Sequence, residues 1–138
     1  QYQVIWHHVG EGHLRQAITA WCQSQMPVNV ECEFIGPLPN REVMLFYKNN
    51  PVDVFINMST SEGGRPVAIM EAMSCGIPAL GPDQGGISEI INKTNGLLLR
   101  PDPDAREIAQ SLHQIVNDRP GFLNLRTQAR ETWKQYFD

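Results

Sequence analysis

The sequence contains no run of about eighteen apolar residues, which excludes a membrane-crossing helix formed from one apolar stretch. Only 19% of the 138 residues are charged and the basic ones are scattered, so we expect no nucleic-acid partner. The three cysteines cannot all pair and none lies in a CxxC motif, which favours buried free thiols in a reducing compartment. The chain opens without a signal-peptide pattern or an initiator methionine, so we expect a fragment of a longer protein.

The composition is that of a folded domain. Apolar residues make up 41% of the chain, which is enough to bury a core, and we expect a single domain over residues 1–138. The net charge is −4. Glycines and prolines gather in short clusters between apolar segments, where they indicate loops.

Short β-branched and aromatic segments alternate with segments whose apolar residues recur at helical spacing. We expect strands at residues 2–9, 30–35, 52–56, 77–80 and 96–99. The third of these is a compact apolar run that suits a strand buried on both faces. We expect helices between and after the strands, including 67–75, 87–91 and about 120–137. This alternation predicts an α/β fold in which a parallel sheet carries helices on both faces.

Ligands of such sheets bind at the carboxyl ends of the strands. That rule selects three loops, at residues 10–12, 36–39 and 59–66. The third loop contains Gly63 and Gly64 and opens a helix whose first backbone N–H groups lack partners within the helix. Because the helix dipole also favours a negative ligand there, we expect this loop to bind a diphosphate.

Two glutamates, Glu62 and Glu71, flank the predicted anion site. A carboxylate is a poor partner for a phosphate, but it accepts the hydrogen bonds that vicinal sugar hydroxyls donate. Glu62 in the loop and Glu71 a turn into the helix would then hold a sugar and a ribose on either side of a diphosphate. The alternative is a loop capped by one glutamate and a surface glutamate on the helix, and the residue types alone leave both open.

Five motifs follow one another along the chain. They are Val9-Gly10-Glu11-Gly12-x-Leu14-Arg15, Phe34-Ile35-Gly36, Ser61-Glu62-Gly63 through Glu71-Ala72-Met73 to Gly76-Ile77-Pro78, Asp83-x-Gly85-Gly86-Ile87-x-Glu89, and Asn95-Gly96-Leu97-Leu98. In this order they resemble the C-terminal, donor-binding domain of glycosyltransferase family 4, from about Val4 to Val116. The resemblance implies a Rossmann-like domain that forms one half of a GT-B glycosyltransferase and lacks its first strand.

The resemblance also implies roles for individual residues. Glu62 is similar to the family's first motif glutamate, a catalytic residue that contacts donor sugar hydroxyls, and Glu71 to the second, which holds the ribose. The implied donor sugar and diphosphate site comprises Gly10, Gly12, Gly63, Gly64, Arg65, Pro66 and Val67. The residues implied to lie beside the base are Ile35, Gly36, Pro37 and Leu38. Family members retain anomeric configuration without a metal ion, so we expect no metal site and no cofactor, and the helix dipole with cationic side chains would stabilise the leaving diphosphate.

The sequence departs from the family pattern in two ways. Eight residues, Gly63 to Met70, separate the two glutamates where the family usually has seven, and the extra one falls before Pro66. Arg65 therefore either adds a cation at the donor or is a solvent-facing loop residue. The family's first strand, with an arginine and a lysine that grip the phosphates, is missing, as is its acceptor-binding N-terminal domain. We therefore expect this chain alone to be inactive.

Two further features argue against other ligands. Arg15 occupies the third glycine position of a dinucleotide-binding fingerprint, which argues against an NAD site. His7 and His8 are adjacent on a predicted strand and would point to opposite faces, which argues against a metal site.

Basic and aromatic residues on the last predicted helix indicate what this helix contacts. The basic stripe formed by Arg126, Arg130 and Lys134 predicts a solvated face, with a membrane surface as the alternative. The aromatic residues near its end are expected to be partly exposed, because the family's last helix packs on the missing domain. These residues are Trp133, Tyr136 and Phe137.

The leading hypothesis is the donor-binding half of a retaining hexosyltransferase that transfers a sugar from a nucleotide diphosphate sugar to a glycan or lipid-linked acceptor. The acceptor would bind the missing domain, and bacterial surface polysaccharide synthesis is the setting that the resemblance implies. We expect a cytoplasmic protein, with peripheral association at the inner face of the cytoplasmic membrane left open. The alternative function is a non-catalytic Rossmann-like module that binds a nucleotide or a protein.

Overall fold

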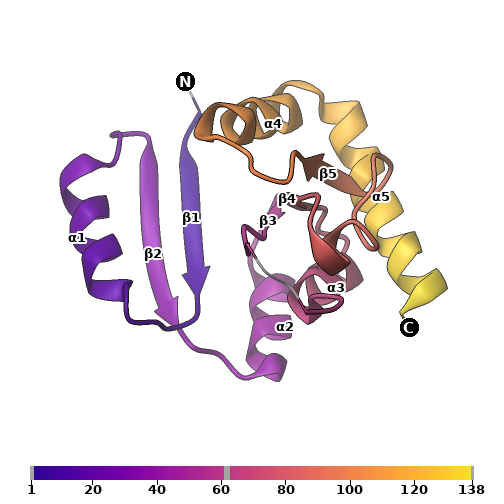
Figure 1. Ribbon diagram of the computed structural model, residues 1–138, viewed down its shortest axis with the longest axis horizontal. Helices are drawn as coiled ribbons and strands as arrows, with labels where there is room; N and C mark the ends of the chain where they lie inside the picture. Colours follow the sequence, from indigo (N-terminus) through magenta and orange to yellow (C-terminus); the bar gives the residue numbers. More distant parts are fainter. Residues whose placement is uncertain (1, 61–62, 138) are drawn as a thin grey trace. The chain divides into compact units, whose positions relative to one another are not determined.

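The computed structural model describes residues 2–60 and 63–137, which form two compact units (Figure 1). The N-terminal unit is Gln1–Phe46 and the C-terminal unit is Tyr47–Asp138. Each unit contains parallel strands that alternate with helices, so the predicted α/β class is confirmed. In the described part of the chain, no helix combines the length and the apolar character needed to cross a membrane.

The N-terminal unit is built on one pair of parallel strands. β1 (Val4–Val9) pairs with β2 (Val30–Gly36), and α1 (Arg15–Gln25) connects them. α2 (Asn40–Asn49) continues from this unit into the next. Among the described residues, β2 is the only strand neighbour of β1, so the other edge of β1 is open. On the faces of this strand pair, Val4 and Ile5 of β1 are 43% and 51% exposed.

The C-terminal unit contains a three-stranded parallel sheet in the order β3-β4-β5. The strands are Phe55–Ile56, Ala79–Pro82 and Gly96–Leu99. The helices are α3 (Val67–Ser74), α4 (Ala105–Asn117) and α5 (Arg119–Tyr136), with a short 3-10 turn, η1 (Gly85–Ile87), after β4. β4 is the central strand and every one of its residues is buried. α5 packs against both α3 and α4.

Aliphatic side chains of α3 anchor the core of the C-terminal unit. Ile69 and Met73 are completely buried, and they pack with Ile87 of η1 in one apolar cluster. Burying each side chain of this size stabilises the fold by about 1.5–3 kcal/mol. The opposite side of the first turn is open, with Val67 exposed to 61%. The core therefore fixes α3 while its N-terminus stays accessible.

The Asn95-Gly96 motif has a structural role. Asn95 is buried, its Oδ1 accepts a hydrogen bond from the backbone N–H of Asn92 (2.8 Å), and its Nδ2 donates to the carbonyl of Ile90 (2.9 Å). A Cβ at Gly96 would lie 2.4 Å from the carbonyl oxygen of Ala79. The pair therefore closes the turn before β5 and lets β5 approach β4.

Some predicted elements are confirmed and others differ. The strand at 96–99 is confirmed, and the helix that starts at Val67 ends at Ser74, followed by Gly76 at φ +68°, a conformation that favours glycine. Among the described residues, the strands pair as β1-β2 in the N-terminal unit and as β3-β4-β5 in the C-terminal unit. The predicted strand at 52–56 is shorter, because β3 covers only Phe55–Ile56. The prediction that it is buried on both faces is wrong, because Ile56 is 41% exposed. The segment 87–91 forms the end of η1 and a turn instead of a helix.

The capping pattern before α4 is half formed. Asp104 Oδ1 accepts a hydrogen bond from the backbone N–H of Glu107 at 2.8 Å, which caps the start of the helix. The carboxylate of Glu107 binds the backbone N–H and the Nε of Arg100 instead, at 2.8 and 2.6 Å. These hydrogen bonds hold the pKa of Glu107 below its usual value.

The prediction of a solvated basic face on α5 is wrong for two of its three residues. Arg126 Nη1 donates to the carbonyl of Val52 at 2.8 Å, and Arg130 donates to the carbonyl of Ser74, the last residue of α3. A helix C-terminus leaves carbonyls without partners and favours a cation, which explains the position of Arg130. Lys134 is the exposed member and pairs with Glu131. Arg126 and Arg130 are therefore not part of a basic surface that could contact a membrane.

The aromatic residues at the end of α5 also differ in how far they are buried. Trp133 and Phe137 pack against the core cluster, and the guanidinium of Arg130 lies 4.7 Å from the ring centroid of Trp133. Tyr136 is 66% exposed. Of the three aromatics predicted to be partly exposed, Tyr136 is therefore the one with a mostly exposed side chain.

Candidate functional site

Backbone amides at the start of α3 form the core of the candidate site. Pro66 occupies the N-cap position in an extended conformation, and the N–H of Ile69 bonds to its carbonyl at 3.1 Å. Among the hydrogen bonds between described residues, none uses the backbone amides of Gly63, Gly64, Arg65, Val67 and Ala68. All five residues are exposed, and the first turn of α3 has no acidic residue. The arrangement favours an anion.

Gly86 holds the loop before α3 in place. A Cβ at Gly86 would lie 2.1 Å from the carbonyl oxygen of Gly64 and 2.8 Å from the amide nitrogen of Arg65. The segment around η1 therefore packs directly on the backbone of the loop. The Cβ positions of Gly63 and Gly64, by contrast, have no atom within 4 Å. This side of the loop leaves room for a ligand to approach the backbone.

Glu71 lies a turn into α3 and is half-buried. Its carboxylate is close enough to Tyr47 of α2 to act on it electrostatically. Burial, followed by the charges of Glu71 and Cys75, raises the pKa of Tyr47 to about 12. The sequence analysis did not identify Tyr47 as a site residue, because it lies among the apolar positions of an amphipathic helix and belongs to none of the five motifs.

The raised pKa of Tyr47 predicts a pH dependence. The ordinary tyrosine value is 10.0, so the folded protein holds this proton more tightly than the unfolded chain does. The free energy of unfolding is therefore expected to fall as the pH rises from about 10 to about 12. Tyr47→Phe is expected to remove that part of the fall together with a tyrosinate absorbance step near pH 12. Alkaline absorbance titration and denaturant unfolding of both proteins check this, and an unchanged titration in Tyr47→Phe would contradict it.

In the N-terminal unit, two of the predicted loops meet. The backbone N–H of Gly10 donates to the carbonyl of Gly36 at 2.9 Å, because the parallel strands β1 and β2 end side by side. Gly10 and Gly36 both have positive φ, at 139° and 90°, which favours glycine at each position. Gly36 is buried, whereas the Ile35 and Pro37 side chains on either side of it are exposed, and Leu38 is half-buried.

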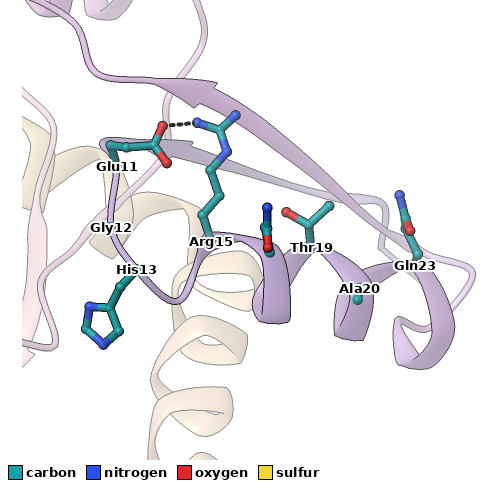
Figure 2. Close-up of a pocket in the computed structure, with 8 residues that line it drawn as sticks. Glu11, Gly12, His13, Arg15, Thr19, Ala20 and Gln23 are labelled. Atoms are coloured by element: carbon teal, nitrogen blue, oxygen red, sulfur yellow. Dashed lines mark hydrogen bonds and ion pairs between the residues drawn. The ribbon is translucent and has the colours of Figure 1, made fainter.

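A groove of about 610 Å³ runs along the start of α1 (Figure 2). It is lined by Glu11, Gly12, His13, Arg15, Gln16, Thr19, Ala20 and Gln23. Arg15 pairs with Glu11 at 2.5 Å and its Nη2 donates to the carbonyl of Phe34 at 3.4 Å, so the motif arginine ties the loop to β2. In Figure 2, Arg15 and Thr19 project from the same side of α1 while His13 points away. Gly12, a predicted donor residue, is part of this groove.

The predicted site residues thus gather in two places, one in each unit. Gly10, Gly12 and residues 35–38 lie at the ends of β1 and β2, and residues 63–67 with Glu71 lie at the start of α3. Pro66 is the buried member of the second group. Glu62, the predicted catalytic residue, lies outside the described residues.

The histidines and cysteines have structural surroundings. His7 Nδ1 lies 2.8 Å from Glu33 Oε2, whereas the ring of His8 packs on Phe34. The cysteines are free, but only Cys22 is fully buried. Burial, with the neighbouring Cys22 thiol, raises the pKa of Cys32 to about 11. Within residues 2–60 and 63–137, no three His, Cys, Asp or Glu side chains are grouped closely enough to hold a metal ion.

Parallel strands alternating with helices, together with open amides at a helix start, define a Rossmann-like domain of the kind found in GT-B glycosyltransferases. The chain matches the family model described as glycosyl transferases group 1 over residues 2–136, and it belongs to that family.

Relatives and solved structures agree with this family. The O-antigen biosynthesis glycosyltransferase WbnH of Escherichia coli is 37% identical over 102 residues, which cover 72% of this chain and 27% of WbnH. The amylovoran biosynthesis glycosyltransferase AmsK of Erwinia amylovora is 29% identical over 86 residues, 60% of this chain and 21% of AmsK. The crystal structure of Anabaena HepE with UDP and glucose matches with a TM-score of 0.77 at 18% identity, covering 99% of this chain and 45% of HepE. The chain therefore spans less than half the length of these proteins.

Proposed function

We propose that this chain is the C-terminal, donor-binding half of a family 4 glycosyltransferase that uses a nucleotide diphosphate sugar in the cytoplasm. One observation carries the proposal: the exposed amides at the start of α3 lack partners among the described residues, and Glu71 follows a turn later. Membership of the group 1 family and the fold shared with HepE, whose structure contains UDP and glucose, support it.

In this proposal the backbone N–H groups of residues 63–65, 67 and 68 bind the diphosphate, and Glu71 accepts hydrogen bonds from the ribose hydroxyls. The family resemblance supports Glu62 as the residue that contacts the donor sugar, Gly10 and Gly12 as donor contacts, and residues 35–38 as the segment beside the base. Transfer retains the configuration of the sugar. The dipole of α3 and nearby cations, with no metal ion, stabilise the negative charge that develops on the leaving diphosphate.

The rest of the activity depends on residues outside this chain. We propose that another domain binds a glycan or lipid-linked acceptor, and that the full protein acts in bacterial surface polysaccharide synthesis. The names of WbnH and AmsK, which refer to O-antigen and amylovoran biosynthesis, support this setting. The edge of β1 that has no strand partner among the described residues supports a further strand that pairs there in the longer protein.

Calorimetric titration with UDP and GDP tests the proposed function. We expect one of the two to bind this chain weakly and to bind a polypeptide that includes the upstream residues at least about tenfold more tightly, a gain of about 1.4 kcal/mol. Uridine or guanosine, which lack the diphosphate, serve as matched controls and are expected to bind more weakly. Failure of both nucleoside diphosphates to bind the longer polypeptide would favour the non-catalytic alternative.

A further inference from the structure

Arg65 is the cation nearest to the candidate diphosphate site in sequence, and two side chains hold it. Its Nε donates to Glu89 Oε2 at 3.0 Å, and its guanidinium carbon lies 5.8 Å from the ring centroid of Phe137. Glu89 follows η1 and Phe137 follows α5, so two distant segments of the C-terminal unit meet at this side chain. Arg65 also lies where the chain has one residue more than the family pattern.

These contacts occupy two sides of the guanidinium and leave a third. Glu89 accepts a hydrogen bond from Nε, and the guanidinium carbon lies over the ring of Phe137. Among the described residues, none hydrogen-bonds to the terminal Nη groups of Arg65. Those two groups form the fork that binds a phosphate through paired hydrogen bonds.

The two contacts of Arg65, with Glu89 and with Phe137, differ in strength because the two partners differ in exposure. The side chains of Arg65 and Glu89 are 55% and 59% exposed, and an ion pair this open to solvent contributes little to stability. Phe137 is a firmer support, because it is half-buried and packs against the core cluster. The loop itself is fixed by the close approach of Gly86 to Gly64. Glu89 therefore adds little to the stability of this arrangement, and its contribution is to set the direction of the Arg65 guanidinium.

We propose that Glu89 and Phe137 are positioning residues that hold Arg65 so that its Nη groups bind the diphosphate of the donor. The proposal rests on the proposed function, since it assumes a diphosphate at the start of α3. Glu89 balances the positive charge of Arg65 but does not use its Nη groups. In this proposal Arg65 therefore binds the diphosphate through well-directed hydrogen bonds and not through a net positive charge. If Glu89 instead competed with the diphosphate for Arg65, removal of the Glu89 carboxylate would tighten diphosphate binding instead of weakening it.

A double-mutant cycle in the full-length protein tests the positioning role. The probe is UDP or GDP, whichever binds, with its nucleoside as the reference ligand. Arg65→Gln is expected to weaken diphosphate binding about tenfold and Glu89→Ala about threefold to fivefold, while neither changes nucleoside binding. Glu89→Gln keeps the acceptor oxygen and is expected to stay within about twofold of the wild type. In the Arg65→Gln background, Glu89→Ala is expected to have no further effect. Lys134→Gln, which breaks an exposed ion pair on α5, is the matched control.

Four outcomes would overturn the proposal. Tighter diphosphate binding in both Glu89 variants would show competition, and an equal loss from Glu89→Ala with and without Arg65 would show a general effect on the fold. Unchanged binding in Glu89→Ala would remove the role of Glu89. A wild-type protein that binds diphosphate and depends on Glu71, but not on Arg65, would leave the proposed function standing while this inference fails. Absence of any diphosphate binding would instead contradict the proposed function.

Discussion

Replacing Glu71 by alanine is expected to weaken nucleoside diphosphate binding about 100-fold, or by about 2.7 kcal/mol. The physical reason is the loss of two hydrogen bonds from ribose hydroxyls to a carboxylate, each contributing about 1.5 kcal/mol. Calorimetry on the full-length protein with UDP and GDP gives the affinity. Because Glu71 is half-buried beside Tyr47, Glu71→Gln provides a second variant that fills the same volume.

The ligand provides the sharpest control for Glu71. A 2′,3′-dideoxy form of the same nucleoside diphosphate lacks the hydroxyls, so it is expected to bind the wild type and Glu71→Ala with equal affinity. Glu131→Ala, which removes an exposed carboxylate paired with Lys134, is expected to leave binding unchanged. A Glu71→Ala variant that discriminates against the dideoxy ligand as strongly as the wild type would show that Glu71 does not hold the ribose.

Gly86→Ala is expected to produce the largest structural effect. Its new methyl group would lie 2.1 Å from the carbonyl oxygen and 2.4 Å from the carbonyl carbon of Gly64, so backbone must move. We expect the free energy of unfolding to fall by about 2–3 kcal/mol, because overpacking of this kind forces backbone shifts. The shift also displaces the amides that precede α3, so diphosphate binding is expected to fall by at least about tenfold. Denaturant unfolding and calorimetry measure the two effects.

Gly63→Ala is the matched stability control for Gly86→Ala. The Cβ position of Gly63 has no atom within 4 Å, and its φ is not in the left-handed region. Its free energy of unfolding is therefore expected to stay within about 0.5 kcal/mol of the wild type or to rise slightly, because alanine restricts the unfolded chain. Equal stability of the two alanine variants would contradict the contact between Gly86 and the loop.

Local signals predicted much of the fold. The strand at 96–99, the start of α3 after Pro66 and its end before Gly76 follow from residues that act on their immediate neighbours. The loops 10–12 and 36–39 meet because parallel strands place their carboxyl ends together, which the strand pattern already implied.

Long-range contacts set the features that the sequence did not predict. Arg126 and Arg130 have the spacing of a solvated stripe, yet they turn inward to carbonyls of residues far earlier in the chain. Spacing along one helix does not reveal which distant carbonyls lack donors. The pairing of Arg65 with Glu89, and the position of Tyr47 beside Glu71, likewise depend on how segments pack. The unpaired amides of Val67 and Ala68 could be predicted because they follow from the helix start alone.

A crystal structure of the full-length protein with the nucleoside diphosphate that it binds is the most direct test of the proposed donor site. We expect the diphosphate oxygens to lie about 3 Å from backbone amides within residues 63–68, and the ribose hydroxyls to lie at hydrogen-bond distance from the Glu71 carboxylate. A diphosphate bound elsewhere, with the amides at the start of α3 facing solvent or bonded within the protein, would contradict the site proposed for this chain.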